Sequence, residues 1–221
     1  MLPDLPQTEV AIVELTNAFR KAGALQQVKP NPALAAAARA FAEYLARTGK
    51  FAHEADGRKP EDRAQAQGYR YCLVAENLAW NLNSRGFESA QLAREVVEGW
   101  KASPGHRENL LLRGATDIGV AVVRVPDRNP KFLSVQLFGR PESLKVTFSI
   151  QNQSGKAVSY TLGTETEVLQ PRETVTHTNC DARPLGVDKT DKAPRFNPRD
   201  GDRFVIRPGA GSSIEVNVER K

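Results

Sequence analysis

The hydrophobic periodicity of this chain changes along its length, and that change limits the folds open to it. Apolar residues at helical spacing predict helical segments in the first half, at residues 8–21, 32–48, 60–67, 89–101 and 105–112. Thr8 is the expected N-cap of the first helix, and Gly49 stops the second. Residues 117–125 and 131–138 are rich in β-branched and aromatic residues, and a polar turn joins them as a predicted hairpin. Helices with an antiparallel sheet predict an α+β layered domain.

A second change in pattern follows Gly139-Arg140-Pro141. Residues 144–151 alternate, and one face of the predicted strand carries Leu144, Val146, Phe148 and Ile150. Further short strands are predicted between Gly, Pro and Asn turns, at residues 158–162, 174–178, 202–206 and 213–218. The charged stretch 188–203 has no clear period and is expected to be a solvated loop. We therefore expect two domains, a layered one at residues 1–141 and a small all-β sandwich at residues 142–221.

The composition is that of an ordinary globular protein. The chain has 221 residues, of which 40% are hydrophobic and 26% charged. The net charge is +5, but Lys and Arg are scattered among nearly as many acids, so we expect no nucleic-acid partner. No run of 18 apolar residues predicts a transmembrane segment. The first residues lack the charged and apolar regions of a signal peptide, so an exported protein would have a leader absent from this sequence.

Two acidic residues of the predicted helix 89–101 differ in their position on the helix. An apolar stripe on this helix is formed by Leu92, Ala93, Val96, Val97 and Trp100. At about 100° per residue, Glu95 falls on the edge of the stripe and Glu98 nearly opposite it. Because an edge position can face a cleft, Glu95 is the site candidate, and Glu98 is expected to be a solvated surface charge.

Three other ionisable residues stand beside apolar runs. Glu76 follows an apolar patch, so it is expected to be partly buried and to need either a partner or a raised pKa. The alternative is a structural carboxylate that caps a helix N-terminus. His53 and His106 are two of only three histidines. Two histidines with two carboxylates are a donor set for a divalent cation such as Zn²⁺. Their spacing is not that of a local metal motif, so a shared site and separate structural roles both stay open.

Several ordered motifs in the first half resemble the CAP superfamily, which comprises cysteine-rich secretory proteins, antigen 5 and pathogenesis-related 1 proteins (SCP/TAPS). These motifs are Phe51-Ala52-His53, Glu76-Asn77-Leu78-Ala79, Ser103-Pro104-Gly105-His106-Arg107-Glu108-Asn109-Leu110-Leu111 and Ile118-Gly119-Val120-Ala121. The short form of the third motif is similar to the bacterial SCP-like branch. The resemblance implies an α-β-α sandwich with an open cleft and an exported protein, secreted or in the cell envelope. The β-rich half lies outside the resemblance.

The resemblance also implies a set of cleft residues. The two His and two Glu of the family correspond to His53, Glu76, Glu95 and His106. The histidines would hold a divalent cation, most simply Zn²⁺, and Glu76 and Glu95 would bind a ligand. The chain has few cysteines and a short stretch before His106, unlike animal and plant members, so the activities claimed for those members transfer poorly.

Three functions are compatible with this pattern. The first is a binding module for a small-molecule, lipid, glycan or protein ligand, with walls from Phe51, Trp80 and Trp100, although the pattern favours all three as core residues. The second is a hydrolase, with a zinc-bound water or with Ser103 as nucleophile and His106 as base, although Ser103 also fits a helix cap. The third is a structural interaction module in which the four polar residues only rigidify the cleft.

The two cysteines stand in different halves of the chain. An even count in an exported protein permits one disulfide, which would join Cys72 and Cys180. The alternative is two buried thiols. The sequence alone does not choose between them, because a disulfide requires a short separation between the two Cα atoms.

Overall fold

The computed structural model describes the chain except residues 1, 182, 188–194, 212 and 221. The chain divides into two compact units, Met1–Ser143 and Leu144–Lys221. The predicted α+β class is confirmed, with helices and a sheet in the first unit and strand-rich sheets in the second. Neither Cys72 nor Cys180 is a free thiol.

The first unit contains the predicted helices, with small shifts at their ends. They are α1 (Leu5–Ala22), α2 (Pro32–Thr48), α3 (Pro60–Ala66), α4 (Ser89–Ala102) and α5 (Pro104–Leu110). The N-cap expected at Thr8 is wrong. The cap is Asp4, whose carboxylate accepts a hydrogen bond from the amide of Gln7, and the Thr8 hydroxyl donates to the Asp4 carbonyl from inside the first turn. Gly49 ends α2 in the left-handed conformation as expected.

The sheet of the first unit has four strands. They are β1 (Lys29–Pro30), β2 (Tyr71–Leu82), β3 (Asp117–Val125) and β4 (Lys131–Pro141), in the order β1-β3-β4-β2. The predicted hairpin of β3 and β4 is confirmed. The strand β2 was not predicted, because its central residues Glu76, Asn77 and Leu78 are all buried and the alternation of a half-exposed strand is absent. Among the described residues this long strand pairs with β4 alone, so it forms one edge of the sheet.

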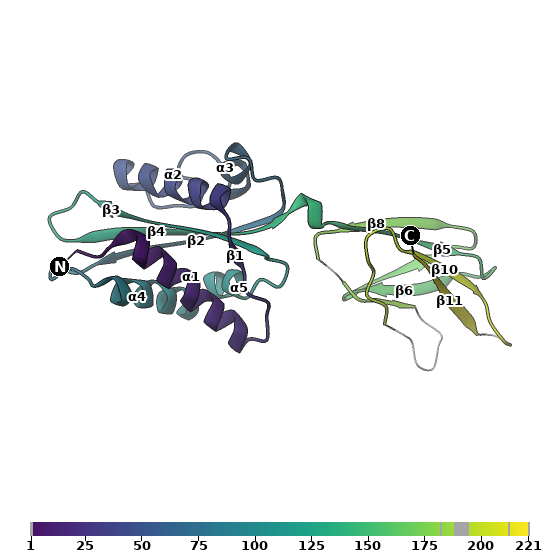
Figure 1. The fold of residues 1–221 in the computed structure, drawn as a ribbon. Helices are drawn as coiled ribbons and strands as arrows, with labels where there is room; N and C mark the ends of the chain where they lie inside the picture. Colours follow the sequence, from purple (N-terminus) through teal and green to yellow (C-terminus); the bar gives the residue numbers. More distant parts are fainter. Residues whose placement is uncertain (1, 182, 188–194, 212, 221) are drawn as a thin grey trace. The chain divides into compact units, whose positions relative to one another are not determined.

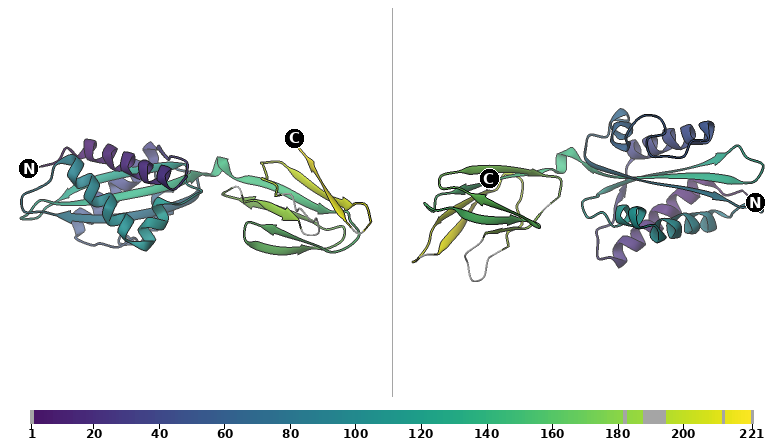
Figure 2. Two further views of the ribbon diagram at one scale, coloured as in Figure 1. Left: turned by 90° about the horizontal axis from the view of Figure 1, so that it is seen from below. Right: turned by 180° about the vertical axis from the view of Figure 1, so that it is seen from behind.

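Helices cover both faces of this sheet, as the resemblance implies. Figures 1 and 2 show α2 and α3 on one face and α1, α4 and α5 on the other. Each face has its own apolar core. The contact of α2 with β3 depends on Gly119, because a Cβ atom there would lie 2.2 Å from the backbone of Leu34.

The second unit is built from strands. They are β5 (Val146–Asn152), β6 (Val158–Leu162), β7 (Glu165–Leu169), β8 (Thr174–Asn179), β9 (Leu185–Val187), β10 (Arg203–Pro208) and β11 (Ile214–Glu219). They form two sheets, in the orders β11-β10-β5-β8 and β7-β6-β9. Apolar residues of both sheets, among them Ile150 and Tyr160, share one core, which makes the unit a β-sandwich.

Details of the second unit differ from what the sequence predicts. The strands β7 and β9 were not predicted, since β7 is charged and exposed along most of its length and β9 is only three residues long. The placement of Leu144 on the strand face is wrong, because this residue ends a short 3-10 helix, η1 (Glu142–Leu144), and is 42% exposed. Much of the predicted loop at 188–203 lies outside the described residues, but Phe196 forms an antiparallel bridge with Leu185.

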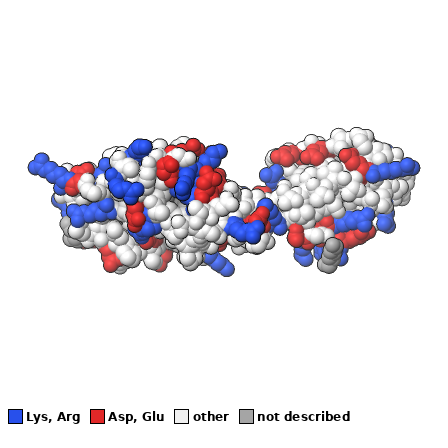
Figure 3. Space-filling view, turned by 90° about the horizontal axis from the view of Figure 1, so that it is seen from above, with Lys and Arg blue, Asp and Glu red and all other residues white. Residues whose placement is uncertain are grey.

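The surface charges are mixed. On the face drawn in Figure 3, basic and acidic side chains lie close to one another and gather into no large patch of one sign. A nucleic-acid backbone is usually bound by a continuous basic patch, and this face does not present one. None of the helices in the described part of the chain is long and apolar enough to cross a lipid bilayer.

Candidate functional site

A buried carboxylate stands at the centre of the candidate site. The side chain of Glu76, on β2, is only 1% exposed. Its Oε1 accepts a hydrogen bond from Nδ1 of His53 at 2.8 Å, and its Oε2 accepts one from Nη2 of Arg63, also at 2.8 Å. A carboxylate removed from water needs such partners, because desolvation of an unpaired charge is costly. The expectation that Glu76 is buried with a partner agrees with the structure, and Glu76 caps no helix.

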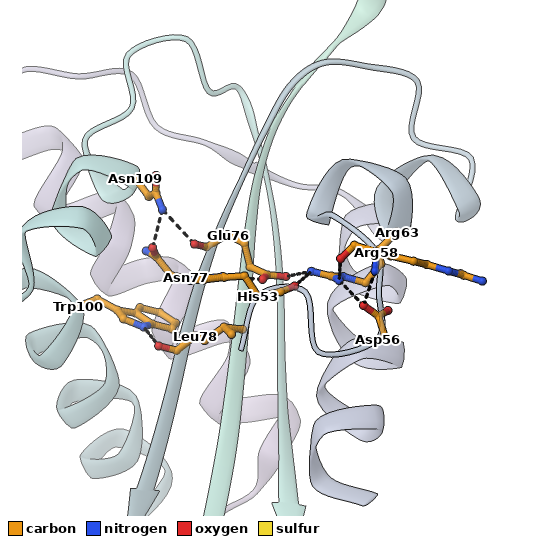
Figure 4. A network of polar contacts seen from close by, with 9 residues as sticks. All are labelled: His53, Asp56, Arg58, Arg63, Glu76, Asn77, Leu78, Trp100 and Asn109. Carbon is orange, nitrogen blue, oxygen red and sulfur yellow. Dashed lines mark hydrogen bonds and ion pairs between the residues drawn. The ribbon is translucent and has the colours of Figure 1, made fainter. Parts of the chain in front are cut away.

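The partner of Glu76 on α3 also holds the loop that carries His53. Nη1 of Arg63 donates to the carboxylate of Asp56 and to the carbonyl of Arg58, each at 2.8 Å. Its Nη2 donates to the carbonyl of His53 at 2.9 Å. The guanidinium lies 3.5 Å from the ring centroid of Phe41, which adds a cation–π contact. Figure 4 shows this network joining α3, the loop and β2.

The opposite side of β2 is tied to α5 by amide side chains. Nδ2 of Asn109 donates to the backbone carbonyl of Glu76 at 3.0 Å and to Oδ1 of Asn77 at 2.9 Å. Nδ2 of Asn77 donates to the carbonyl of His106 at 3.2 Å. These bonds fix the start of α5, and with it His106, against the strand that carries Glu76.

A cleft of about 290 Å³ lies between α4, α5 and the edge of β2. Its lining residues are Phe51, Leu78, Ala79, Trp80, Asn81, Glu95, Val96, Gly99, Trp100, Ser103 and His106. Trp100 is buried, as expected of a core residue, and its indole donates to the carbonyl of Leu78 at 3.0 Å. The expectation that Phe51 and Trp80 are core residues is wrong, because they are 47% and 54% exposed. Phe51 lies in the loop after the end of α2, and Trp80 lies on the edge strand of the sheet.

The four residues implied by the resemblance form two groups. Glu95 and His106 line the cleft, and His53 pairs with Glu76. The two groups are close enough that a positive charge on His53 lowers the pKa of His106. Glu98 lies outside the cleft and forms an ion pair with Lys101 at 2.7 Å.

His53 and His106 differ in the direction in which their pKa values are shifted. The hydrogen bond to Glu76 raises the pKa of His53, against burial and the charge of Arg63, which lower it. Burial lowers the pKa of His106, and the charge on His53 lowers it further. As the pH falls, His53 is therefore the first of the two to carry a proton.

The donor groups do not form a complete metal centre. No group of three or more His, Cys, Asp or Glu side chains in the described part of the chain is placed to hold a metal ion. Both oxygens of Glu76 are engaged, and Oε1 of Glu95 accepts a hydrogen bond from Gln91 at 3.0 Å. A cation here would have the imidazoles of His53 and His106 as its protein ligands, completed by water or by a bound ligand.

Comparison with known proteins places the first unit in a family. The model of the cysteine-rich secretory protein family, CAP, matches residues 13–138, more than half of the chain. The chain belongs to the CAP family. The resemblance drawn from the sequence motifs is thereby confirmed.

Bacterial CAP proteins are among its relatives. The uncharacterized protein YkwD of Bacillus subtilis is 32% identical over 116 residues, which are 52% of this chain and 42% of YkwD. An extracellular protein containing an SCP domain from Bacillus anthracis is 26% identical with a TM-score of 0.51, over 62% of this chain and 41% of that one. An outer surface protein of Borrelia burgdorferi shares the fold, with a TM-score of 0.51 and 24% identity over 59% of this chain and 90% of that one. The match thus spans less than half the length of the two Bacillus proteins.

Arg63, Asn77 and Asn109 were not assigned a role from the sequence. A lone carboxylate in an apolar run needs a positively charged side chain as its partner when it is buried. The sequence could therefore have predicted an arginine or lysine beside Glu76. It does not say which of the many arginines supplies the charge. The amide residues stand in the motifs of the resemblance, but their roles as crosslinks depend on β2, which was not predicted.

We expect Glu76→Gln to lower the pKa of His53, since the substitution removes the carboxylate that stabilises the imidazolium. In the wild type, the raised pKa means that the pair stabilises the fold below about pH 6.5, the unfolded value. That contribution is lost as the pH rises through the folded pKa of His53. NMR titration of the imidazole C–H signals measures the pKa of His53 in the wild type and in the variant. Glu98→Gln is the control and should leave the pKa values of His53 and His106 unchanged. An unaltered pKa of His53 in Glu76→Gln would contradict the role of this carboxylate.

Proposed function

We propose that the CAP unit is an exported ligand-binding module whose site is the cleft beside β2. One observation carries the proposal. Two large side chains, Phe51 and Trp80, are about half exposed at a cleft that also presents Glu95 and His106. Exposed aromatic rings beside a few polar groups are typical of binding sites, because the rings supply apolar contact area and the polar groups orient the ligand.

The walls of the cleft are held rigidly, which favours binding. The loop before Asp56 is fixed by Arg63, and α5 is fixed to β2 by Asn109. Side chains placed in advance lose little conformational entropy when a ligand binds. Ser103 is at the N-cap position of α5, as expected, although its side chain makes no capping hydrogen bond.

The relatives support a location outside the cytoplasm. The Bacillus anthracis protein is described as extracellular, and the Borrelia protein as an outer surface protein. Carried to this chain, these descriptions favour an exported protein whose cleft meets ligands in the cell envelope or the medium.

A flat aromatic cation is a suitable probe of the cleft. We expect benzamidine to bind, with its ring against Trp80 or Phe51 and its amidinium on the carboxylate of Glu95. Trp80→Ala and Glu95→Gln should each weaken binding by about fivefold or more, since each removes about 1 kcal/mol of contact. Chemical-shift titration by NMR measures the affinity.

Glu98→Gln is the matched control for Glu95→Gln, because both lie on α4 and lose one negative charge. Its affinity for benzamidine should stay within about twofold of the wild type. Absence of saturable binding, or an effect of Glu98 as large as that of Glu95, contradicts the proposed site.

A divalent cation held by His53 and His106 is part of the proposal, with Zn²⁺ as the first choice. We expect His53→Ala and His106→Ala each to lower the affinity for Zn²⁺ by about tenfold or more, because two imidazoles are the protein ligands. Affinity should also fall as the pH drops through the raised pKa of His53, since a protonated imidazole does not bind metal. Calorimetric titration tests this, and equal affinity in all three proteins contradicts it.

A further inference from the structure

The outer edge of β2 carries backbone groups without a strand partner. In the described part of the chain β2 pairs with β4 alone, and the register runs unbroken from Leu73 to Leu82. The carbonyls of Glu76 and Leu78 accept side-chain hydrogen bonds from Asn109 and Trp100, so they point away from β4. Successive residues of a strand direct their N–H and C=O groups to alternate sides.

The same alternation applies further along β2. Trp80 and Leu82 lie two and four residues after Leu78, so their N–H and C=O groups also point away from β4. None of the backbone hydrogen bonds outside the regular elements involves either residue in the described structure. Side chains of α4 and α5 thus bind the outward carbonyls of Glu76 and Leu78, and no such bond reaches the next two outward residues in the described structure.

The cleft surrounds this open edge from two sides. The side chain of Leu78 packs in the core under α2. The side chains of Trp80 and Leu82 therefore face the same side of the sheet, because they lie two and four residues further along the strand. Phe51 lies on this side too, in the loop after α2. Glu95 and His106 belong to α4 and α5, which cover the other side. The cleft therefore has the aromatic side chains of Phe51 and Trp80 on one side of the sheet edge, and the carboxylate of Glu95 and the imidazole of His106 on the other.

We propose that the cleft binds an extended polypeptide segment, which adds a strand to β2 at Trp80–Leu82. The proposal rests on the proposed function and names the class of ligand. An added strand directs its side chains alternately to the two faces of the sheet. Apolar side chains of the segment would lie against Phe51 and Trp80, and basic side chains would meet Glu95.

Two of the features by which sheets prevent strand pairing are missing from this edge. Between Leu73 and Leu82 there is no bulge and no proline. Trp80 and Leu82 are 54% and 44% exposed, and exposed apolar side chains on an open edge favour addition of a strand. A lipid or a glycan has no row of alternating N–H and C=O groups to match these backbone groups, whereas an extended peptide has one.

The test uses the whole protein and a synthetic hexapeptide of alternating lysine and valine, with both ends blocked. Hydrogen exchange by NMR should show fast exchange for the amides of Trp80 and Leu82 in the unbound protein, and slow exchange for Ala79 and Asn81, which pair with β4. Saturation with the peptide should slow the exchange of Trp80 and Leu82 by about tenfold or more. Exchange that is unchanged at saturation overturns the proposal.

Two modified peptides provide matched controls. One carries N-methyl groups on its lysines and the other on its valines. Each peptide thus loses every second amide proton, those of one edge of the extended chain. Only the amide protons of alternate residues face β2 in an added strand. One modified peptide should therefore bind about tenfold or more weakly than the parent, and the other within about threefold of it. Equal affinity of the two overturns strand addition. Trp80→Ala should weaken the parent peptide, whereas Glu98→Gln should not.

The outcomes separate this inference from the proposed function. Benzamidine binding that depends on Glu95, together with no binding of the peptide, overturns strand addition and leaves the binding module in place. Failure of both probes overturns both proposals.

Discussion

The buried ion pair of Glu76 and Arg63 is the interaction on which the site depends. It joins β2 to α3, and through Asp56 and the carbonyl of His53 it also fixes the loop that carries the first histidine. A charge buried without its partner costs about 3–5 kcal/mol, so neither residue can be replaced alone without a large penalty. The main effect of the pair is on geometry, because it fixes the position of His53. The charge of His53 in turn lowers the pKa of His106.

The second determinant is the position of β2 at the edge of the sheet. An edge strand exposes unpaired backbone groups, and folded proteins usually cover them. Here Trp100 and Asn109 satisfy two outward carbonyls, and the cleft begins where their coverage ends. The same strand therefore holds the buried carboxylate at its centre and the exposed Trp80 towards its end. This arrangement links the rigid network to the surface at which we propose that a ligand binds.

The helices and the hairpin of β3 and β4 were predictable because their apolar patterns are regular and local. The position of Glu95 at the cleft also follows from the apolar stripe of α4, which needs no tertiary information. The strand β2 was missed because burial on both sides of its central residues removes the alternation, and the exposure of Trp80 was missed with it. Phe51 lies in the loop after α2, where no local pattern indicates its exposure. Roles for Arg63 and Asn109 depend on contacts across the sheet, which no local pattern encodes. The family motifs led to four candidate residues but not to their grouping into a pair and a cleft.

A double-mutant cycle of Glu76→Gln and Arg63→Gln tests most directly whether this ion pair organises the site. Both tryptophans, Trp80 and Trp100, belong to the first unit, so their fluorescence during denaturant unfolding reports on that unit. We expect each single substitution to destabilise by about 3 kcal/mol, and the double variant to be more stable than the sum predicts by about 2 kcal/mol. Additive effects within about 0.5 kcal/mol would show that the two residues act independently, and would contradict the account.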